Sequence, residues 1–168
     1  MNILFDERLD GELVHRDKAD VLSDLQGAVP SLTLLHREED LRPFECDGLA
    51  AYRVLPMLVA LPETLEQVEG LLKRCHALGV PVVTRGAGTG LSGGALPLEQ
   101  GVLLVMSRFN QIITVDPDAR IARVQPGVRN LAISEAAAPY GLYYAPDPSS
   151  QIACSIGGNV AENAGGVH

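Results

Sequence analysis

Two glycine-rich segments limit what this chain of 168 residues can fold into. The first spans 85–94 and contains five glycines, Gly86, Gly88, Gly90, Gly93 and Gly94. The second spans 155–166 and contains four, Gly157, Gly158, Gly165 and Gly166. Because glycine loses more conformational entropy on folding than other residues, such clusters mark tight turns or places where the main chain touches a ligand. Without Cβ atoms in the way, successive N–H groups can point into one concavity and bind an anion.

A strand–helix–strand unit comes directly before the first glycine segment. Residues 58–61 and 80–83 predict two short buried strands. Between them, 64–78 carries apolar residues at helical spacing, and Thr64 with Gln67 matches a capping box. This order predicts a βαβ unit with parallel strands.

The segments after it predict an α+β fold whose second sheet is mixed or antiparallel. Residues 101–106 predict a strand, and 112–115 with 121–124 predict a hairpin. Residues 130–140 predict a helix with Asn130 as its cap.

The N-terminal part predicts helices and loops. Residues 19–29 carry apolar side chains at helical spacing, and Pro30 ends that helix. We expect residues 1–50 to form a helical and loop extension that wraps the domain, and 51–168 to form the domain itself.

Three kinds of glycine-rich, phosphate-binding loop can be compared with the first segment. A P-loop needs Lys followed by Ser or Thr, but the only lysines are Lys18 and Lys73. Residues 88–93 match the letters of a dinucleotide-binding Rossmann loop, yet 94–101 leaves no room for the helix that should follow. A strand-to-strand loop that holds a diphosphate by main-chain N–H groups therefore fits best.

Charge and composition exclude several classes of function. Thirteen basic and 21 acidic residues give a net charge of −8, which disfavours nucleic acid and anionic membrane surfaces as partners. No apolar run approaches the roughly 20 residues that a membrane helix needs, so no direct membrane insertion is expected. Cys46, Cys75 and Cys154 are scattered, which predicts reduced thiols, a cytoplasmic protein and no metal site.

A family resemblance rests on the two glycine segments. Residues 81–94 resemble the pyrophosphate loop of the FAD-binding domain shared by vanillyl-alcohol oxidase and p-cresol methylhydroxylase, and 145–166 resemble its second flavin loop. Within this family, the sequences of the two segments are most similar to those of the FAD-linked subunit of glycolate oxidase and of D-lactate dehydrogenases. Residues 45–48 and 62–64 resemble the same group of proteins. The resemblance runs from about residue 40 to the end of the chain.

The resemblance implies an FAD-dependent oxidoreductase for small 2-hydroxy acids such as glycolate or D-lactate, with hydride passing from the substrate α-carbon to flavin N5. It also implies iron–sulfur and second flavin-type partner subunits, through which the protein would lie at the inner membrane. Family members are several times longer, so this chain is expected to be a truncated first part of the domain, inactive alone and without assigned catalytic residues. A non-catalytic nucleotide-binding or assembly module and an inactive gene fragment remain alternatives.

The resemblance assigns cofactor contacts to both segments. The predicted set is Arg85, Gly86, Ala87, Gly88, Thr89, Gly90, Leu91, Pro146, Ser155, Ile156, Gly157, Gly158, Asn163 and Ala164. Within it, 86–91 would wrap the diphosphate, and the members from the second segment would line the ribityl chain and the isoalloxazine.

Three individual expectations accompany that set. Arg85 either offsets phosphate charge or is an ordinary surface residue, and Asp47 is expected to be a solvated loop carboxylate. The first loop contains no histidine of the kind that bonds to flavin in covalent family members, so the FAD is expected to be non-covalent. Structural or surface roles are expected for His15, His36 and His76.

Overall fold

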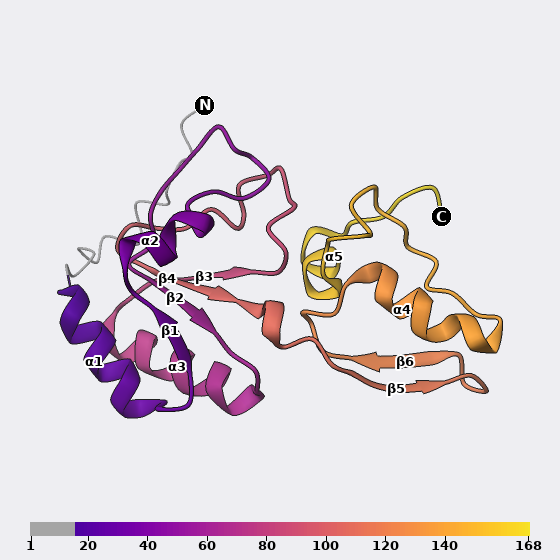
Figure 1. The fold of residues 1–168 in the computed structure, drawn as a ribbon, viewed down its shortest axis with the longest axis horizontal. Helices are drawn as coiled ribbons and strands as arrows, with labels where there is room; N and C mark the ends of the chain where they lie inside the picture. The colour runs from indigo at the N-terminus through magenta and orange to yellow at the C-terminus, as the bar shows by residue number, and fades with distance from the viewer. Residues whose placement is uncertain (1–15) are drawn as a thin grey trace.

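Two sheets lie one after the other along the chain (Figure 1). The computed structural model describes residues 16–168. The first sheet has the strand order β1-β2-β4-β3, in which β2, β4 and β3 are parallel and β1 is antiparallel to β2. Its strands are β1 (Thr33–Leu35), β2 (Leu58–Leu61), β3 (Val82–Arg85) and β4 (Val102–Val105). The second sheet is the predicted hairpin of β5 (Ile112–Asp116) and β6 (Ile121–Val124).

Residues 16–168 also contain five α-helices and three 3₁₀ turns. The α-helices are α1 (Lys18–Ala28), α2 (Glu38–Leu41), α3 (Leu65–Leu78), α4 (Asn130–Ala137) and α5 (Ile156–Glu162), and the 3₁₀ turns are η2 (Arg42–Phe44), η3 (Met106–Arg108) and η4 (Ala138–Tyr140). The prediction for α3 is confirmed in detail, because Thr64 and Gln67 form the capping box and Gly79 ends the helix at φ 68°.

The two central strands of the first sheet, β2 and β4, are buried on both faces, and the alternation of their side chains divides the core in two. Leu58, Ala60, Val102 and Leu104 face α1 and α3, where they pack with Val21, Leu25, Leu71 and Cys75. Val59, Leu61, Leu103 and Val105 face the opposite side, where Leu41 and half-buried Phe44 and Leu55 cover them. This is the pattern of a parallel sheet that is covered on both faces.

The connection from β3 to β4 creates the site. The two strands are parallel neighbours, so the chain must travel back along the full strand length between them. It does so through residues 86–101, which contain neither helix nor strand. Loops of this length without secondary structure are usually functional. This one begins at the carboxyl edge of the parallel strands, where ligands of open parallel sheets bind.

The second sheet is attached to the first by a close main-chain contact at Gly127. Its N–H donates to the Phe109 carbonyl at 2.8 Å, and a Cβ at this position would lie 2.0 Å from the Met106 carbonyl oxygen. Only glycine permits that approach, because the clashing atom is main-chain.

Three sequence predictions need correction. β3 begins at Val82 rather than Val80, because the Val80 N–H donates to the Cys75 carbonyl as part of the α3 ending. Asn130 does not cap α4: Arg129 occupies that position, and the buried Asn130 side chain donates through Nδ2 to the Pro146 carbonyl at 2.9 Å. The N-terminal part is not only helix and loop, because β1 completes the edge of the first sheet.

The three cysteines form no disulfide among the described residues. Cys46, Cys75 and Cys154 are free thiols, and the last two are buried. Burial raises the pKa of the Cys75 thiol to about 11, which keeps it protonated and unreactive at neutral pH. Within residues 16–168, every helix is too short or too polar to cross a bilayer.

Truncation of Leu71 tests the α3 side of the core. Leu71→Ala should lower the free energy of unfolding by about 2–5 kcal/mol, because the side chain is fully buried and its removal leaves a cavity. The matched control is the next residue, Leu72, which is 43% exposed; Leu72→Ala should cost less than about 1 kcal/mol. Urea unfolding followed by circular dichroism measures both changes. Equal losses would contradict the core described here.

Candidate cofactor-binding site

The two glycine segments touch each other at Gly86 and Ser155. Gly86 directly follows β3, and Ser155 is the N-cap of α5, where its Oγ accepts a hydrogen bond from the Gly158 N–H at 3.4 Å. A Cβ on Gly86 would lie 2.0 Å from Ser155 Oγ and 3.3 Å from Ser155 Cβ. The absence of a side chain at Gly86 is therefore what lets the second segment close onto the first.

A cavity of about 250 Å³ lies between the two segments. Eight members of the predicted cofactor set line it: Gly86, Ala87, Gly88, Thr89, Gly90, Ser155, Gly158 and Ala164. A second hollow, of about 440 Å³, shares Gly86, Ala87 and Ser155 with the first and extends toward Asn110 and Arg129. The contact between the segments thus lies where the two hollows meet.

The first segment presents a row of uncommitted hydrogen-bond donors. Across residues 16–168, no group accepts a hydrogen bond from the main-chain N–H groups of residues 86–94. Gly88 and Gly93 also have positive φ angles, 69° and 79°, which change the direction of successive amides. Main-chain donors without protein partners need solvent or a ligand, and a run of them forms an anion-binding loop. This donor set fits a diphosphate.

Arg85 shapes the first segment from beneath. Its side chain is buried; Nη1 donates to the Phe44 carbonyl at 3.1 Å, and Nη2 and Nε donate to the Ala95 carbonyl at 2.7 and 3.2 Å. Burial lowers the pKa of this guanidinium, and the nearby Asp47 carboxylate opposes that shift. The surface alternative for Arg85 is wrong. The side chain links the start of the loop to its far end and does not line the cavity.

Asp47 is buried, which corrects the expectation of a solvated carboxylate. It is 7% exposed, lines the cavity, and accepts the Leu49 N–H through Oδ1 at 2.9 Å. Its Oδ2 is buried without a hydrogen-bond partner among the described residues. Asp47 is buried because the neighbouring Gly48 lets this segment lie directly against the glycine loop: a Cβ on Gly48 would lie 2.6 Å from the Gly90 carbonyl oxygen.

Other members of the predicted set surround the cavity without lining it. Gly157 packs against Pro126: its N–H donates to the Pro126 carbonyl at 2.9 Å, and a Cβ there would lie 2.8 Å from Pro126 Cβ. Asn163 ends α5 with φ 50°, and Leu91 is 72% exposed. Arg85, Leu91, Pro146, Ile156, Gly157 and Asn163 are all outside the lining, and their cofactor contacts stay predictions.

Several lining residues were missed by the sequence analysis. They are Asp47, Thr84, Ser92, Gly94, Ala95, Ser150, Cys154, Asn159, Ala161 and Glu162. A signal existed for those on α5, because Ser155, Gly158, Asn159 and Glu162 recur at helical spacing and therefore share one face of the helix. Asp47 and Ser150 lie within the segments of the family resemblance, 45–48 and 145–166, but nothing in those segments indicated that either residue lines the cavity.

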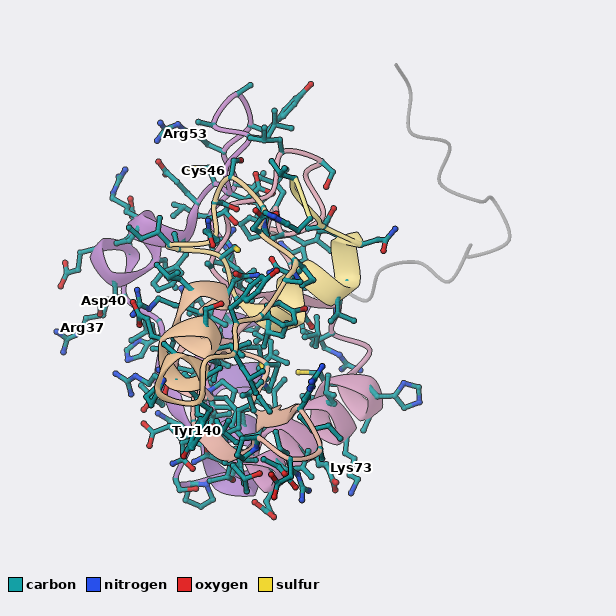
Figure 2. The ribbon with its side chains drawn as sticks, turned by 90° about the vertical axis from the view of Figure 1, so that its right-hand side faces the viewer. Arg37, Asp40, Cys46, Arg53, Lys73 and Tyr140 are labelled. Atoms are coloured by element: carbon teal, nitrogen blue, oxygen red, sulfur yellow. The ribbon has the colours of Figure 1, made fainter. Side chains whose placement is uncertain are left out.

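The cavity is acidic. Asp47 and Glu162 line it, and Lys, Arg and His are absent from its lining within residues 16–168. Figure 2 shows Arg37, Arg53 and Lys73 at the outer surface, pointing away from the body of the molecule.

The described histidines also lie apart from the cavity. His36 and His76 are exposed, as expected, and His15 is outside the described residues. The His168 ring lies 2.9 Å from Asp147 Oδ2, and its main-chain N–H donates to Oδ1 at 3.1 Å. These hydrogen bonds lower the pKa of Asp147.

Known proteins similar to this chain are flavoproteins. The family described as "FAD binding domain" matches residues 56–168. The "Glycolate oxidase subunit GlcD" of Escherichia coli (strain K12) is 68% identical over 168 residues, which covers 100% of this chain and 34% of that protein. The "D-lactate dehydrogenase" of Archaeoglobus fulgidus is 40% identical over 110 residues, which covers 66% of this chain and 24% of that protein. This chain thus spans about a third or less of the length of these relatives.

A solved structure confirms the predicted fold class. The crystal structure of p-cresol methylhydroxylase with substrate bound superposes with a TM-score of 0.71 at 24% sequence identity, and the match covers 87% of this chain and 29% of that one. At this identity the similarity concerns the fold alone.

The contact between Gly86 and Ser155 can be tested by a double-mutant cycle. Gly86→Ala should lower the free energy of unfolding by about 1–3 kcal/mol, because the new Cβ overlaps Ser155 Oγ. Ser155→Ala alone should cost about 1 kcal/mol through loss of the helix cap. The double variant should be less destabilised than the sum, because Oγ is gone. Gly90→Ala is the control, since a Cβ there meets nothing within 4 Å. Strict additivity in denaturant unfolding would refute the contact.

Proposed function

This chain belongs to the FAD binding domain family, and we propose that its two glycine-rich segments together hold one FAD molecule without a covalent bond. The observation that supports this most directly is the row of uncommitted N–H groups at 86–94, in a loop that lines a cavity shared with the second segment. Such a loop neutralises a diphosphate by oriented amide dipoles rather than by a cationic side chain.

The remaining donors and acceptors suit the uncharged parts of FAD. Ser155 and Asn159 both line the cavity and supply neutral hydrogen-bonding groups of the kind that ribityl hydroxyls and the isoalloxazine edge require. Asn159 Nδ2 is a buried donor without a partner among residues 16–168, so it has a hydrogen bond still to make. Pro146 and Asn163 lie on the segments that flank this part of the site.

We further propose that the whole protein oxidises a small 2-hydroxy acid, with glycolate and D-lactate as the candidates. The support is the naming of the relatives: a glycolate oxidase subunit at 68% identity and a D-lactate dehydrogenase at 40%. Bound FAD supplies a hydride acceptor at N5 for the substrate α-carbon. In that reaction the residues of this chain bind and orient the cofactor, and the acid–base groups are assigned to none of them.

Partner subunits form the last part of the proposal. The Escherichia coli relative is named a subunit, which supports assembly with other chains. The iron–sulfur subunit and the second flavin-type subunit are proposed on the family resemblance alone. The three cysteines in the described part are free and form no cluster, so residues 16–168 do not themselves supply the ligands of an iron–sulfur centre. A cytoplasmic protein that reaches the inner membrane through such partners is consistent with this arrangement.

Flavin titration tests the binding proposal. The purified chain should quench FAD fluorescence reversibly, inorganic diphosphate should compete, and acid precipitation should release all flavin into the supernatant because no covalent bond is formed. Riboflavin, which lacks the diphosphate, is the control and should bind at least ten-fold more weakly. Failure of FAD to bind, or flavin retained in the precipitate, would contradict the proposal.

Turnover tests the proposed reaction. The chain of 168 residues should give no dye reduction with glycolate or D-lactate, because it contributes only cofactor-binding groups. A protein of the relatives' length that carries these residues should reduce the dye with one of the two acids and not with acetate, which has no 2-hydroxyl. Steady turnover by the 168-residue chain alone would contradict the proposal that its residues only bind the cofactor.

A further inference from the structure

The acidic residues of the cavity are unexpected for a site that binds phosphate. Its lining contains the carboxylates of Asp47 and Glu162, whereas the lining residues, all within 16–168, include no basic side chain. On the basis of the proposed FAD site, we infer that Glu162 is a specificity determinant: it favours a diphosphate esterified at both ends, as in FAD, over ligands that end in a free phosphate, such as FMN or ADP.

Glu162 is exposed to solvent at the edge of the cavity, beside the loop that carries the uncommitted N–H groups. It is the last residue of α5, and Ser92 Oγ donates to its Oε2 at 3.0 Å. Its Oε1 lies 3.2 Å from the position of a Cβ on Gly94. Ser92 and Gly94 both belong to the first glycine segment, so the carboxylate reaches across from the second segment to the loop that carries the free N–H groups.

The cation nearest to the loop among the lining's neighbours, Arg85, lies beside Asp47 and offsets that carboxylate, and no ion pair of Glu162 is found within residues 16–168. The guanidinium beneath the loop, that of Arg85, already donates to the carbonyls of Phe44 and Ala95. The buried Asp47 adds a second carboxylate on the same cavity. A phosphate bound here therefore meets favourable amide dipoles on one side and like charge on the other.

The sign of the effect follows from the charges of the ligands. FAD spreads about two negative charges over the two phosphates of its internal diphosphate, whereas the terminal phosphate of FMN or ADP concentrates nearly two on one group because its second pKa is about 6. Amide N–H groups can stabilise a phosphate that carries one charge. The second charge on a terminal phosphate is repelled by the Glu162 carboxylate. At a separation of about 8 Å and an effective dielectric constant of about 40, between the values of a protein surface and of water, one extra charge on the nearest phosphate corresponds to roughly a three- to ten-fold loss of affinity.

The experiment compares dissociation constants for FAD, FMN and ADP at low ionic strength in wild-type chain and variants. Glu162→Gln keeps the shape and can still accept from Ser92, but removes the charge. It should tighten FMN and ADP by about three- to ten-fold and FAD by less than about three-fold. Ser92→Ala removes the hydrogen bond to Glu162 and keeps the charge. This variant should therefore still bind FAD more tightly than FMN and ADP.

Glu69→Gln is the matched control for net charge, because Glu69 lies on α3, pairs with Lys73, and is outside the cavity lining. It should leave all three affinities unchanged, and circular dichroism should show wild-type folding for every variant. Added salt should reduce the Glu162→Gln effect on FMN and ADP.

Two results overturn the inference in distinguishable ways. If FAD binds the wild-type chain and Glu162→Gln leaves the ratio of FAD to FMN affinity unchanged, the role of Glu162 is wrong and the FAD site stands. If neither the wild-type chain nor any folded variant binds FAD, the proposed function fails and the inference fails with it.

Discussion

The contact of Gly86 with Ser155 is the constraint on which the rest of the site depends. Gly86 leaves β3 at the carboxyl edge of the parallel strands, and Ser155 begins α5 about 70 residues later. Because a Cβ on Gly86 would lie 2.0 Å from Ser155 Oγ, glycine at this position lets the two segments meet without displacing the Ser155 side chain. The cavity exists because they meet: its walls are the free amides of one segment and the helical face of the other.

The surrounding structure holds each segment in place for reasons separate from ligand binding. Arg85 ties the start of the loop to Ala95 and Phe44, and Gly48 allows the 44–48 stretch to lie against Gly90. On the other side, Gly157 packs on Pro126. These contacts leave the N–H groups of the loop unused, so the protein meets the anion with main-chain dipoles in a cavity whose charged side chains are acidic. The combination suits an internal diphosphate, and membership of the FAD binding domain family agrees with it.

Local sequence patterns predicted the elements well where one segment alone decides the outcome. The capping box and terminal glycine of α3 are confirmed, as are the β5–β6 hairpin and the absence of a helix after the first glycine segment. The errors lie where a distant partner decides. The sequence predicted Asn130 as a helix cap, but its side-chain amide donates to the Pro146 carbonyl instead. Residues 33–35 form the strand β1 because they pair with β2, which is distant in sequence.

The sequence by itself determined that this chain has two glycine-rich turns, a βαβ unit before the first and a hairpin before the second, because spacing, capping residues and glycine clusters act over a few residues. The family resemblance depended on the same short patterns. Only the tertiary structure decided that Asp47 is buried, that Arg85 is occupied by carbonyls, and that Glu162 reaches Ser92. Those outcomes depend on contacts between residues tens of positions apart, which no local spacing encodes.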